Sequence, residues 1–535
     1  MFCQIVYLRR CIPGRIRRAL DELPETLDET YAQSLKEIDK QNQEYAHRLF
    51  QCVAAASRPL RVKELAEFLA FDFEAGPIPT FLADWRPEDP THTVLSTCSS
   101  FLAVVDVDGS PVIQFTHFSV KEYLTSGRLA TTKDTISSYH VSMTSAHTTL
   151  VQACLGVLLH LDKSITRVSL EYFPLSKYAS RYWVDHARFG NVASTVHDGI
   201  KRLFDPRKSH LSVWVWIYDP ENNQSRYIES ERPRRARATP LHYAAFCGMH
   251  DAATFLIVEH SQDVHARAFD MNETPLHVAS RRGHAKLTRV LLKHGADTEA
   301  GNRVKDTPLL LASRKGHVEV VRDLLEHDAN TETRGFSGCN ALEFAIYGDH
   351  IEVARLLMEN GADVKAQDRN ENTSLYWALE WGKLAAAQEL IEHGADVEAL
   401  CKNKKTLLHR AKGEEAARLL LEHGADANAL DIENRTPLHL ASENGRVGVV
   451  RALLEHGADA NARDASNSTP LHLAANSGAP HYADISLLLL QYGSDVHARD
   501  DKSWTPFMRA CDAHARDEKI RLRSWEQRQQ TCMTT

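Results

Sequence analysis

Histidine and cysteine are the residues of this sequence best suited to chemistry, and the chain holds 28 histidines and 10 cysteines. Imidazole and thiolate groups at short, regular intervals would indicate a zinc site. The cysteines form no C-x-x-C pair, however, and the sequence contains no H-E-x-x-H. Scattered cysteines of this kind are typical of reduced thiols in an intracellular protein.

Ten of the histidines recur at two fixed positions. One set follows Thr-Pro-Leu or a close variant of it, and the other stands just before a predicted helix end. Because the neighbours recur with the histidines, we predict that these side chains are structural and bond to the backbone within a repeat. The two sets are His242, His277, His409, His439 and His472, and His294, His327, His393, His423 and His456.

Other catalytic patterns are also missing. The sequence has no G-x-x-x-x-G-K-[ST] phosphate loop and no dinucleotide-binding glycine motif, and Gly335-Phe336-Ser337-Gly338 does not match the hydrolase pattern G-x-S-x-G. Paired acids such as Glu414-Glu415 lie in predicted helices, where they are solvated charges. We therefore predict a protein that is not an enzyme, with no catalytic residues and no cofactor, metal or small-molecule substrate.

The recurring histidines belong to a repeated segment. Its copies are separated by 35, 33, 33, 33, 33, 30, 33 and 36 residues. They begin at Thr239, Thr274, Thr307, Asn340, Thr373, Thr406, Thr436, Thr469 and Thr505. A fixed period of this length indicates a stack of small units, each unable to bury its apolar face alone.

One copy shows how the unit folds. Thr436 can cap a helix, and proline suits the first helical position because its missing N–H would have no partner there. A short first helix is predicted to end before Gly445, and a second helix carries the apolar stripe Val447, Val450, Leu453 and Leu454. Gly457 should end the second helix, and a polar hairpin tip follows.

With its period near 33 and its Thr-Pro-Leu-His text, the segment resembles the ankyrin repeat, in about nine copies. Four copies depart from the pattern. Asp328 replaces a helix-ending glycine, Asn340 and Ala341 replace the capping threonine and the proline, the Thr406 copy is three residues short, and the Thr469 copy has extra residues near Pro480. We expect a local change of curvature near residues 406–425 and a bulge near 478–485.

The N-terminal part is predicted to be helical with a small β-hairpin. Residues 42–57 and 62–71 have the pattern of two amphipathic helices, and residues 101–107 and 112–115 have that of strands. Asp108-Gly109 between the strands favours a tight turn. Two helices followed by a two-stranded wing indicate a winged-helix layout.

Three segments of this part resemble fungal NACHT-ankyrin proteins of the STAND class. They are Leu23-Pro24-Glu25-Thr26-Leu27, His117-Phe118-Ser119-Val120-Lys121-Glu122-Tyr123-Leu124 and Tyr178-Ala179-Ser180-Arg181-Tyr182-Trp183. The resemblance implies a winged helix of the GPI inositol-deacylase type that follows a NACHT ATPase. No phosphate loop is present, so ATPase activity is not carried over, and we expect either a truncated gene product or a free-standing sensor half.

The fold class we predict is mainly α, an ankyrin solenoid preceded by a winged-helix and helical module. The predicted parts are a helical lead-in that ends a NACHT-type region (1–40), a winged helix (41–130), a helical segment (131–218), a linker (219–238), the repeats (239–515) and a C-terminal cap (516–535).

The charge and hydropathy of the chain limit the classes of partner that it is expected to bind. The net charge is −8, and residues 1–130 hold 14 Lys and Arg against 18 Asp and Glu, so a basic face for nucleic acid is not expected. The longest apolar stretch, residues 150–161, is too short to span a bilayer. We expect a cytoplasmic protein. A nuclear location rests only on the basic stretch Arg232–Arg237. The alternative function is that of a DNA-binding winged-helix regulator whose ankyrin arm binds a partner.

The predicted function is binding of an unidentified protein partner, as the sensor or scaffold half of a STAND-type receptor. Ankyrin arrays typically bind through their hairpin tips and the exposed ends of their first helices, on the concave side. Arginine, tyrosine and tryptophan at such positions are favoured in interfaces. The candidate residues are Arg281, Arg282, Arg314, Lys315, Tyr347 and Trp381, with the hairpin tips at residues 431–435 and 464–468 as the alternative.

Overall fold

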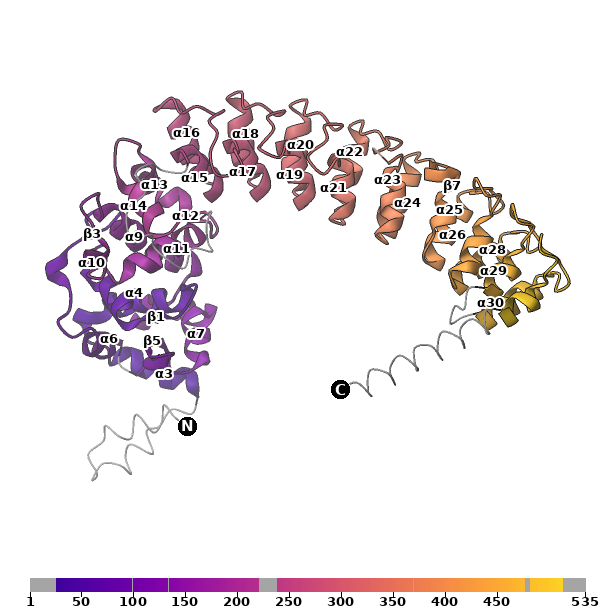
Figure 1. Cartoon of the computed structure of the whole chain (residues 1–535). Coiled ribbons are helices and arrows are strands. Elements are labelled where there is room, and N and C mark those ends of the chain that lie inside the picture. Colours follow the sequence, from indigo (N-terminus) through magenta and orange to yellow (C-terminus); the bar gives the residue numbers. More distant parts are fainter. Residues whose placement is uncertain are drawn as a thin grey trace, which may run out of the picture. The chain divides into compact units, whose positions relative to one another are not determined.

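The computed structural model describes residues 26–98, 100–132, 134–220, 238–368, 370–476 and 482–512. These residues form two compact units, Met1–Phe269 and Asp270–Thr535, coloured from indigo to yellow along the chain in Figure 1. The basic stretch 232–237, the centre of the bulge expected near 478–485 and the C-terminal cap at 516–535 lie outside the described residues.

The N-terminal unit begins with a winged helix. Its described helices and strands are α3 (Leu27–Lys36), α4 (Gln43–Ala55), β1 (Leu60–Arg61), α5 (Val62–Ala66), β2 (Phe71–Asp72), β3 (Thr80–Phe81), α6 (Pro90–Cys98), β4 (Leu102–Val107) and β5 (Ser110–Phe115). The helix expected at 62–71 is shorter, because a 3-10 turn at Glu67–Ala70 follows α5 and Phe71 enters a strand.

The wing is the hairpin of β4 and β5. Val107 pairs with Ser110, and the two turn residues, Asp108 and Gly109, have φ angles of 52° and 74°. Asp106 accepts a hydrogen bond of 2.8 Å from the Gly109 amide, which holds the turn closed. The sequence predicted this hairpin but not β1, which pairs with β5 to complete a three-stranded antiparallel sheet.

A helical segment follows the wing. Its helices are α7 (Phe118–Thr125), α8 (Gly127–Thr131), α9 (Met143–His160), α10 (Arg167–Leu170), α11 (Leu175–Ala187), α12 (Val192–Thr195), α13 (His197–Phe204) and α14 (His210–Ile217). The apolar run from Leu150 to Leu158 is buried in α9, except for half-buried Gln152. Among the aromatic side chains of this segment, Tyr178 and Trp183 are fully buried, whereas Tyr172 is 68% exposed.

The first repeat, α15 (Pro240–Cys247) and α16 (His250–Val258), belongs to the N-terminal unit. The Trp214 ring lies 5.4 Å from that of Trp183 and 6.3 Å from that of Tyr243 in α15. The Arg188 guanidinium also donates to the carbonyl of Cys247. The end of the array is thus covered by aromatic side chains of the helical segment, so its apolar surface is not left in water.

The C-terminal unit consists of helix pairs. They are α17 (Pro275–Arg282) and α18 (Ala285–Lys293), α19 (Pro308–Lys315) and α20 (Val318–Leu325), α21 (Ala341–Tyr347) and α22 (Ile351–Glu359), α23 (Ser374–Glu380) and α24 (Leu384–Glu392), α25 (Leu407–Arg410) and α26 (Glu414–Glu422), α27 (Pro437–Glu443) and α28 (Val447–Glu455), and α29 (Pro470–Asn476) and α30 (Tyr482–Gln491). The ninth copy is helical from residue 506 to residue 512, where the described residues end.

The recurring histidines join neighbouring copies. The Thr436 amide donates to Nδ1 of His439 over 3.1 Å, so the proton of the neutral ring is on Nε2, which donates to the Ser468 carbonyl of the next copy over 3.0 Å. Equivalent bonds run from His277 to Asp306 and from His409 to Arg435. The structural role predicted for these three histidines is confirmed, although their Nε2 atoms bond to the next copy and the prediction placed the bonds within one repeat.

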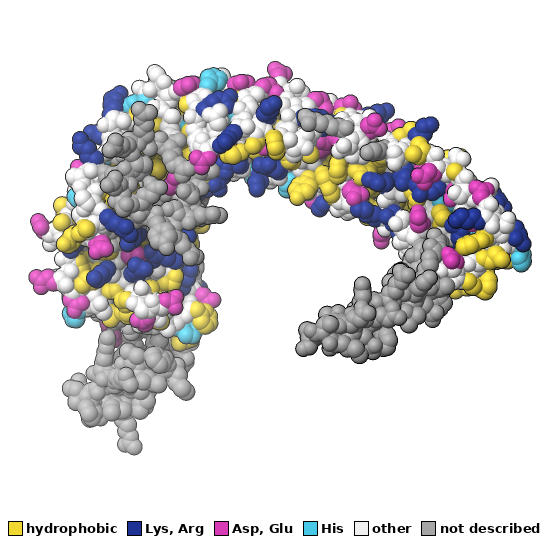
Figure 2. Space-filling model, viewed as in Figure 1, with side chains coloured by type: hydrophobic (Ala, Val, Ile, Leu, Met, Phe, Trp, Pro, Cys, Tyr) yellow, Lys and Arg dark blue, Asp and Glu magenta, His cyan; other side chains and the backbone are white. Residues whose placement is uncertain are grey.

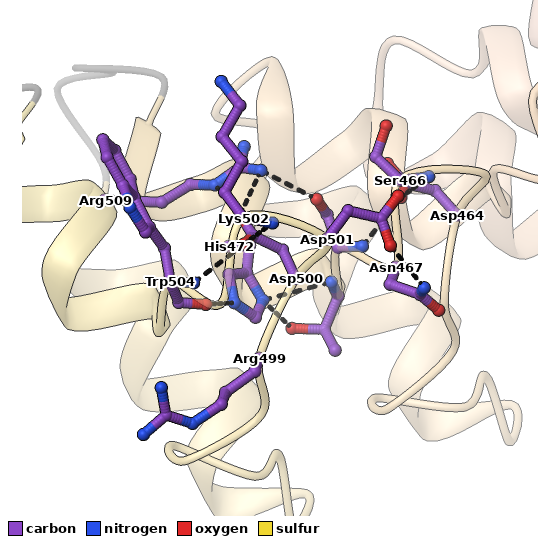
Figure 3. Close-up of polar contacts among 12 residues, drawn as sticks. Asp464, Ser466, Asn467, His472, Arg499, Asp500, Asp501, Lys502, Trp504 and Arg509 are labelled. Carbon is purple, nitrogen blue, oxygen red and sulfur yellow. Dashed lines mark hydrogen bonds and ion pairs between the residues drawn. The ribbon is translucent and has the colours of Figure 1, made fainter.

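The last of these bonds is drawn in Figure 3, where His472 reaches the carbonyl of Trp504 over 3.0 Å. Asp500 beside it accepts from the amides of Lys502 and Trp504 and pairs with Arg509. This hairpin tip is therefore held both by its own aspartate and by the histidine of the preceding copy.

The irregular copies keep the backbone pattern by other means. Asp328 takes the left-handed conformation of the glycine it replaces, with φ of 59°, and Asn467 does the same at a hairpin tip with φ of 56°. Asn340 replaces the capping threonine and still accepts from the Glu343 amide over 2.9 Å. The short copy has only a four-residue first helix, α25, because the three missing residues come from its end.

Leu453→Ala tests the stacking of the repeats. Leu453 is fully buried in α28, so its truncation should lower the free energy of unfolding by roughly 2–5 kcal/mol. The loss should fall mainly on unfolding of the array, followed by circular dichroism in urea. Leu430→Ala, at a side chain that is 55% exposed, should change stability by less than about 0.5 kcal/mol. Equal losses in the two variants would contradict the packing described.

A second prediction concerns His186, which is buried between α9 and α11. Its Nδ1 lies 2.8 Å from Nδ1 of His147, and its Nε2 lies 2.8 Å from the Tyr178 hydroxyl. Burial, with a smaller contribution from His147, lowers the pKa of His186 from 6.5 to about 4. The unfolded chain then binds the proton first, so stability should fall by roughly 3 kcal/mol as the pH drops from about 6.5 to about 4.

His186→Gln removes this titration, and its melting temperature should depend less on pH over that window than that of the unmodified protein. The matched control is His197→Gln, at a half-exposed histidine of α13, which should keep the original pH dependence. An unchanged pH profile in His186→Gln would show that this ring does not carry the effect.

Candidate protein-binding surface

The ends of the first helices form a row along the C-terminal unit. Helices α17, α19, α21 and α23 pack side by side in sequence, along its inner edge in Figure 1. Gly283 and Gly316 follow α17 and α19 with φ angles of 76° and 73°, and Gly382 follows Trp381 with φ of 69°. Because the helices end at equivalent positions of their copies, the side chains of their last turns lie next to one another along the row.

All six predicted residues lie in this row, at or just after the end of a first helix. Arg281 and Arg282 end α17, Arg314 and Lys315 end α19, and Tyr347 ends α21. Trp381 follows α23 directly. Their placement is as expected, and their role in binding stays a prediction.

The four basic residues differ in what they contact. Arg281 donates to Glu273 over 2.9 Å, and its side chain is only 21% exposed. The guanidinium of Arg314 lies 3.6 Å from Asp306 and 5.5 Å from the centre of the Phe344 ring. Arg282 and Lys315 are exposed. Arg281 and Arg314 therefore support the fold as well as contributing charge, whereas Arg282 and Lys315 are the more accessible pair.

The two aromatic residues are in contact with each other. The ring centres of Tyr347 and Trp381 are 5.1 Å apart with the rings nearly perpendicular, and Trp381 stacks on Trp377 at 5.1 Å. Tyr347 is 62% exposed. On the face shown in Figure 2, hydrophobic side chains gather at this level of the inner edge, with Lys and Arg side chains beside them. Rigid rings that already support one another lose little freedom on binding, which favours a docking role.

Sequence reasoning missed three neighbours of this cluster. Trp377 was not singled out, although it stacks on Trp381 and donates to Asp368 over 3.1 Å. Arg410 and Arg446 were not singled out either, although Arg410 ends the first helix of the short copy and Arg446, from the next copy, bonds to the Ala411 carbonyl beside it. The signal available in the sequence was the three-residue shortening, which ends the first helix early and changes what surrounds it.

The alternative binding region, the hairpin tips, is strongly self-bonded. Asp464 accepts from the amides of Ser466 and Ser468 (Figure 3). Asp431 is buried, which raises its pKa, but bonds from the amides of Arg435 and Glu433 and from the Arg435 guanidinium outweigh this and leave the pKa lowered. These aspartates shape the tips, so a partner would meet mainly the side chains around them.

The described part of the chain holds no group of three or more His, Cys, Asp and Glu side chains placed to bind a metal ion. Each described helix is too short or too polar to cross a membrane.

Comparison with known families matches two parts of the chain. Overlapping segments from residue 219 to residue 500, more than half of the chain, match the family described as ankyrin repeats (3 copies). They are 219–302, 297–368, 327–401, 360–431, 375–464 and 413–500. Residues 34–134 match the family described as GPI inositol-deacylase, winged helix domain.

One curated relative is the azaphilone pigments biosynthesis cluster protein L of Monascus ruber. It is 28% identical over 296 residues, which are 52% of this chain and 61% of that protein. The chain therefore spans less than two thirds of the length of this relative.

The neighbouring arginines Arg281 and Arg282 give a direct test of the division described above. Arg281→Ala should lower the free energy of unfolding by about 1–3 kcal/mol, because buried Glu273 would lose a charged donor. Arg282→Ala removes an exposed charge and should cost less than about 0.5 kcal/mol. Urea denaturation of both variants measures the difference, and equal costs would show that the Arg281–Glu273 pair has no structural role.

Proposed function

Because the chain belongs to the ankyrin-repeat proteins and its N-terminal unit contains a winged helix of the GPI inositol-deacylase type, we propose that it is a non-enzymatic protein that binds a protein partner along its row of first-helix ends. The observation that carries this proposal is the paired, accessible Tyr347 and Trp381 beside the exposed cations Arg282 and Lys315. Charge speeds the encounter with a partner, and buried aromatic rings slow its release.

The finer role we propose is that of a sensor or scaffold half of a STAND-type signalling receptor, acting in the cytoplasm. This rests on the three N-terminal segments that resemble NACHT-ankyrin proteins, together with the order of a winged helix, a helical segment and repeats. In such an arrangement the array recognises the partner.

The alternative, DNA binding by the winged helix, is less well supported. Several of its cations are already engaged by carboxylates. Arg58 forms two bonds to Glu64, and Arg86 lies 2.5 Å from Glu67. Both glutamates are almost fully buried, so these arginines are held in place, whereas a DNA reader needs cations that are available to phosphates.

The test is a quantitative pull-down with the full chain as bait, from a lysate of its source organism. The variant carries Arg282→Ala, Lys315→Ala, Tyr347→Ala and Trp381→Ala, and leaves Arg281 and Arg314 in their ion pairs. Partners that dock on the row should be recovered about tenfold less well with this variant.

A matched control carries Lys286→Ala, Lys293→Ala and Tyr492→Ala, which are exposed positions outside the row, and it should retain the partners. Circular dichroism establishes that both variants are folded. Unchanged recovery with the folded row variant would exclude the row and direct attention to the hairpin tips.

A further inference from the structure

The short sixth copy changes which side chains lie around the end of its first helix. In the third copy, whose first helix has its full length, His317 bonds the carbonyl of Arg281, at the end of the preceding first helix, over 3.2 Å. Arg446 follows Thr436 at the same interval as His317 follows Thr307, and it bonds the carbonyl of Ala411 over 2.7 Å. A guanidinium thus occupies the position that an imidazole occupies in the third copy.

A second guanidinium lies nearby. Arg410 ends the short helix α25, donates to the Tyr376 hydroxyl over 2.7 Å and lies 5.4 Å from the centre of that ring. Among the residues that the structure describes, neither Arg410 nor Arg446 forms an ion pair. Burial lowers the pKa of Arg446, Glu380 opposes this, and the charge of Arg410 lowers the pKa further. Two positive charges are therefore held close enough to repel each other.

The carboxylate of Glu380, whose charge acts on both arginines, does not balance this positive charge. Glu380 is bonded at 2.5 Å by a third cation, Lys412. These four side chains, Glu380, Arg410, Lys412 and Arg446, thus carry two positive charges in excess. An anionic ligand would relieve the repulsion between these cations.

An aromatic surface adjoins the cations. Tyr376, bonded by Arg410, contacts Trp377 at 5.1 Å, Trp377 stacks on Trp381 at 5.1 Å with an angle of 24° between the rings, and Trp381 contacts Tyr347. Arginine forks bind carboxylates through paired hydrogen bonds, and aromatic rings offer area to an apolar side chain.

We propose that the arginine–tryptophan patch, formed by Tyr347, Trp377, Trp381, Arg410, Lys412 and Arg446, binds an acidic segment of a protein partner. An aspartate or glutamate carboxylate of that segment is held by Arg410 and Arg446, and a large apolar side chain next to it packs on Trp381 and Tyr347. This inference rests on the proposed function. It adds that the partner's binding segment is acidic, because the patch carries an excess of positive charge.

The experiment uses a displayed library of short random peptides, selected on the full chain and counter-selected on an Arg410→Gln/Arg446→Gln variant. Enriched peptides are synthesised, and their dissociation constants are measured by fluorescence anisotropy. We expect peptides with Asp or Glu next to Leu, Phe or Trp, with affinity that falls as salt rises. Arg410→Gln and Arg446→Gln should each weaken binding about tenfold or more.

Arg451→Gln is the matched control. This arginine is also exposed but lies on α28, and its guanidinium is 3.7 Å from Glu414, so its loss should change affinity less than about twofold. Arg410→Lys and Arg446→Lys provide variants that keep the charge and lose the fork. They should bind more weakly than the unmodified chain, and they replace either glutamine variant if it fails to fold.

Three outcomes would overturn the inference. They are enriched peptides without acidic residues, affinities equal in the unmodified and Arg410→Gln chains, and a selection that yields no peptide depleted by the double variant. The proposed function fails separately, in the pull-down. A partner that is lost from the row variant but retained by Arg410→Gln and Arg446→Gln would leave the row as the binding surface and remove the arginine–tryptophan patch.

Discussion

The bond from one histidine to the next copy is the interaction on which the array depends. In the copies that carry this histidine, the ring nitrogen Nδ1 accepts from the capping threonine, which commits the proton to Nε2 and directs it at a carbonyl of the following hairpin. The ring is buried, so neither nitrogen could be left without a partner at low cost. One side chain thereby fixes the start of its own helix and the position of the next copy.

This arrangement explains why binding residues are found at the other end of the first helix. Threonine, proline and histidine at the start are required by capping and by the bond to the next copy, and the apolar residues of the middle are required by packing. The exposed residues of the last turn are needed neither for capping nor for packing. Arg282, Lys315 and Tyr347 are exposed there, and their identities can follow the needs of a partner.

The departures from regularity have different consequences. Asp328 and Asn467 only replace glycine in a left-handed conformation that both can adopt. The shortened copy, in contrast, brings Arg410 and Arg446 into the same neighbourhood, where their charges act on each other. In the N-terminal unit, Trp214 covers the first repeat, so this end of the array is capped by packing and not by a polar repeat.

The sequence by itself determined the repeat, its helix boundaries, the structural role of the histidines and the wing hairpin. These depend on local spacing and on turn chemistry, as at Asp108-Gly109. It also located the six candidate residues at the helix ends. Only the tertiary structure decided which of them are accessible. Arg281 and Arg314 turn to Glu273 and Asp306, while Tyr347 and Trp381, from different copies, meet. It also supplied β1 and the approach of Arg410 and Arg446. Such contacts join residues distant in the chain, so they follow from how the helices stack and have no periodic signal in the sequence.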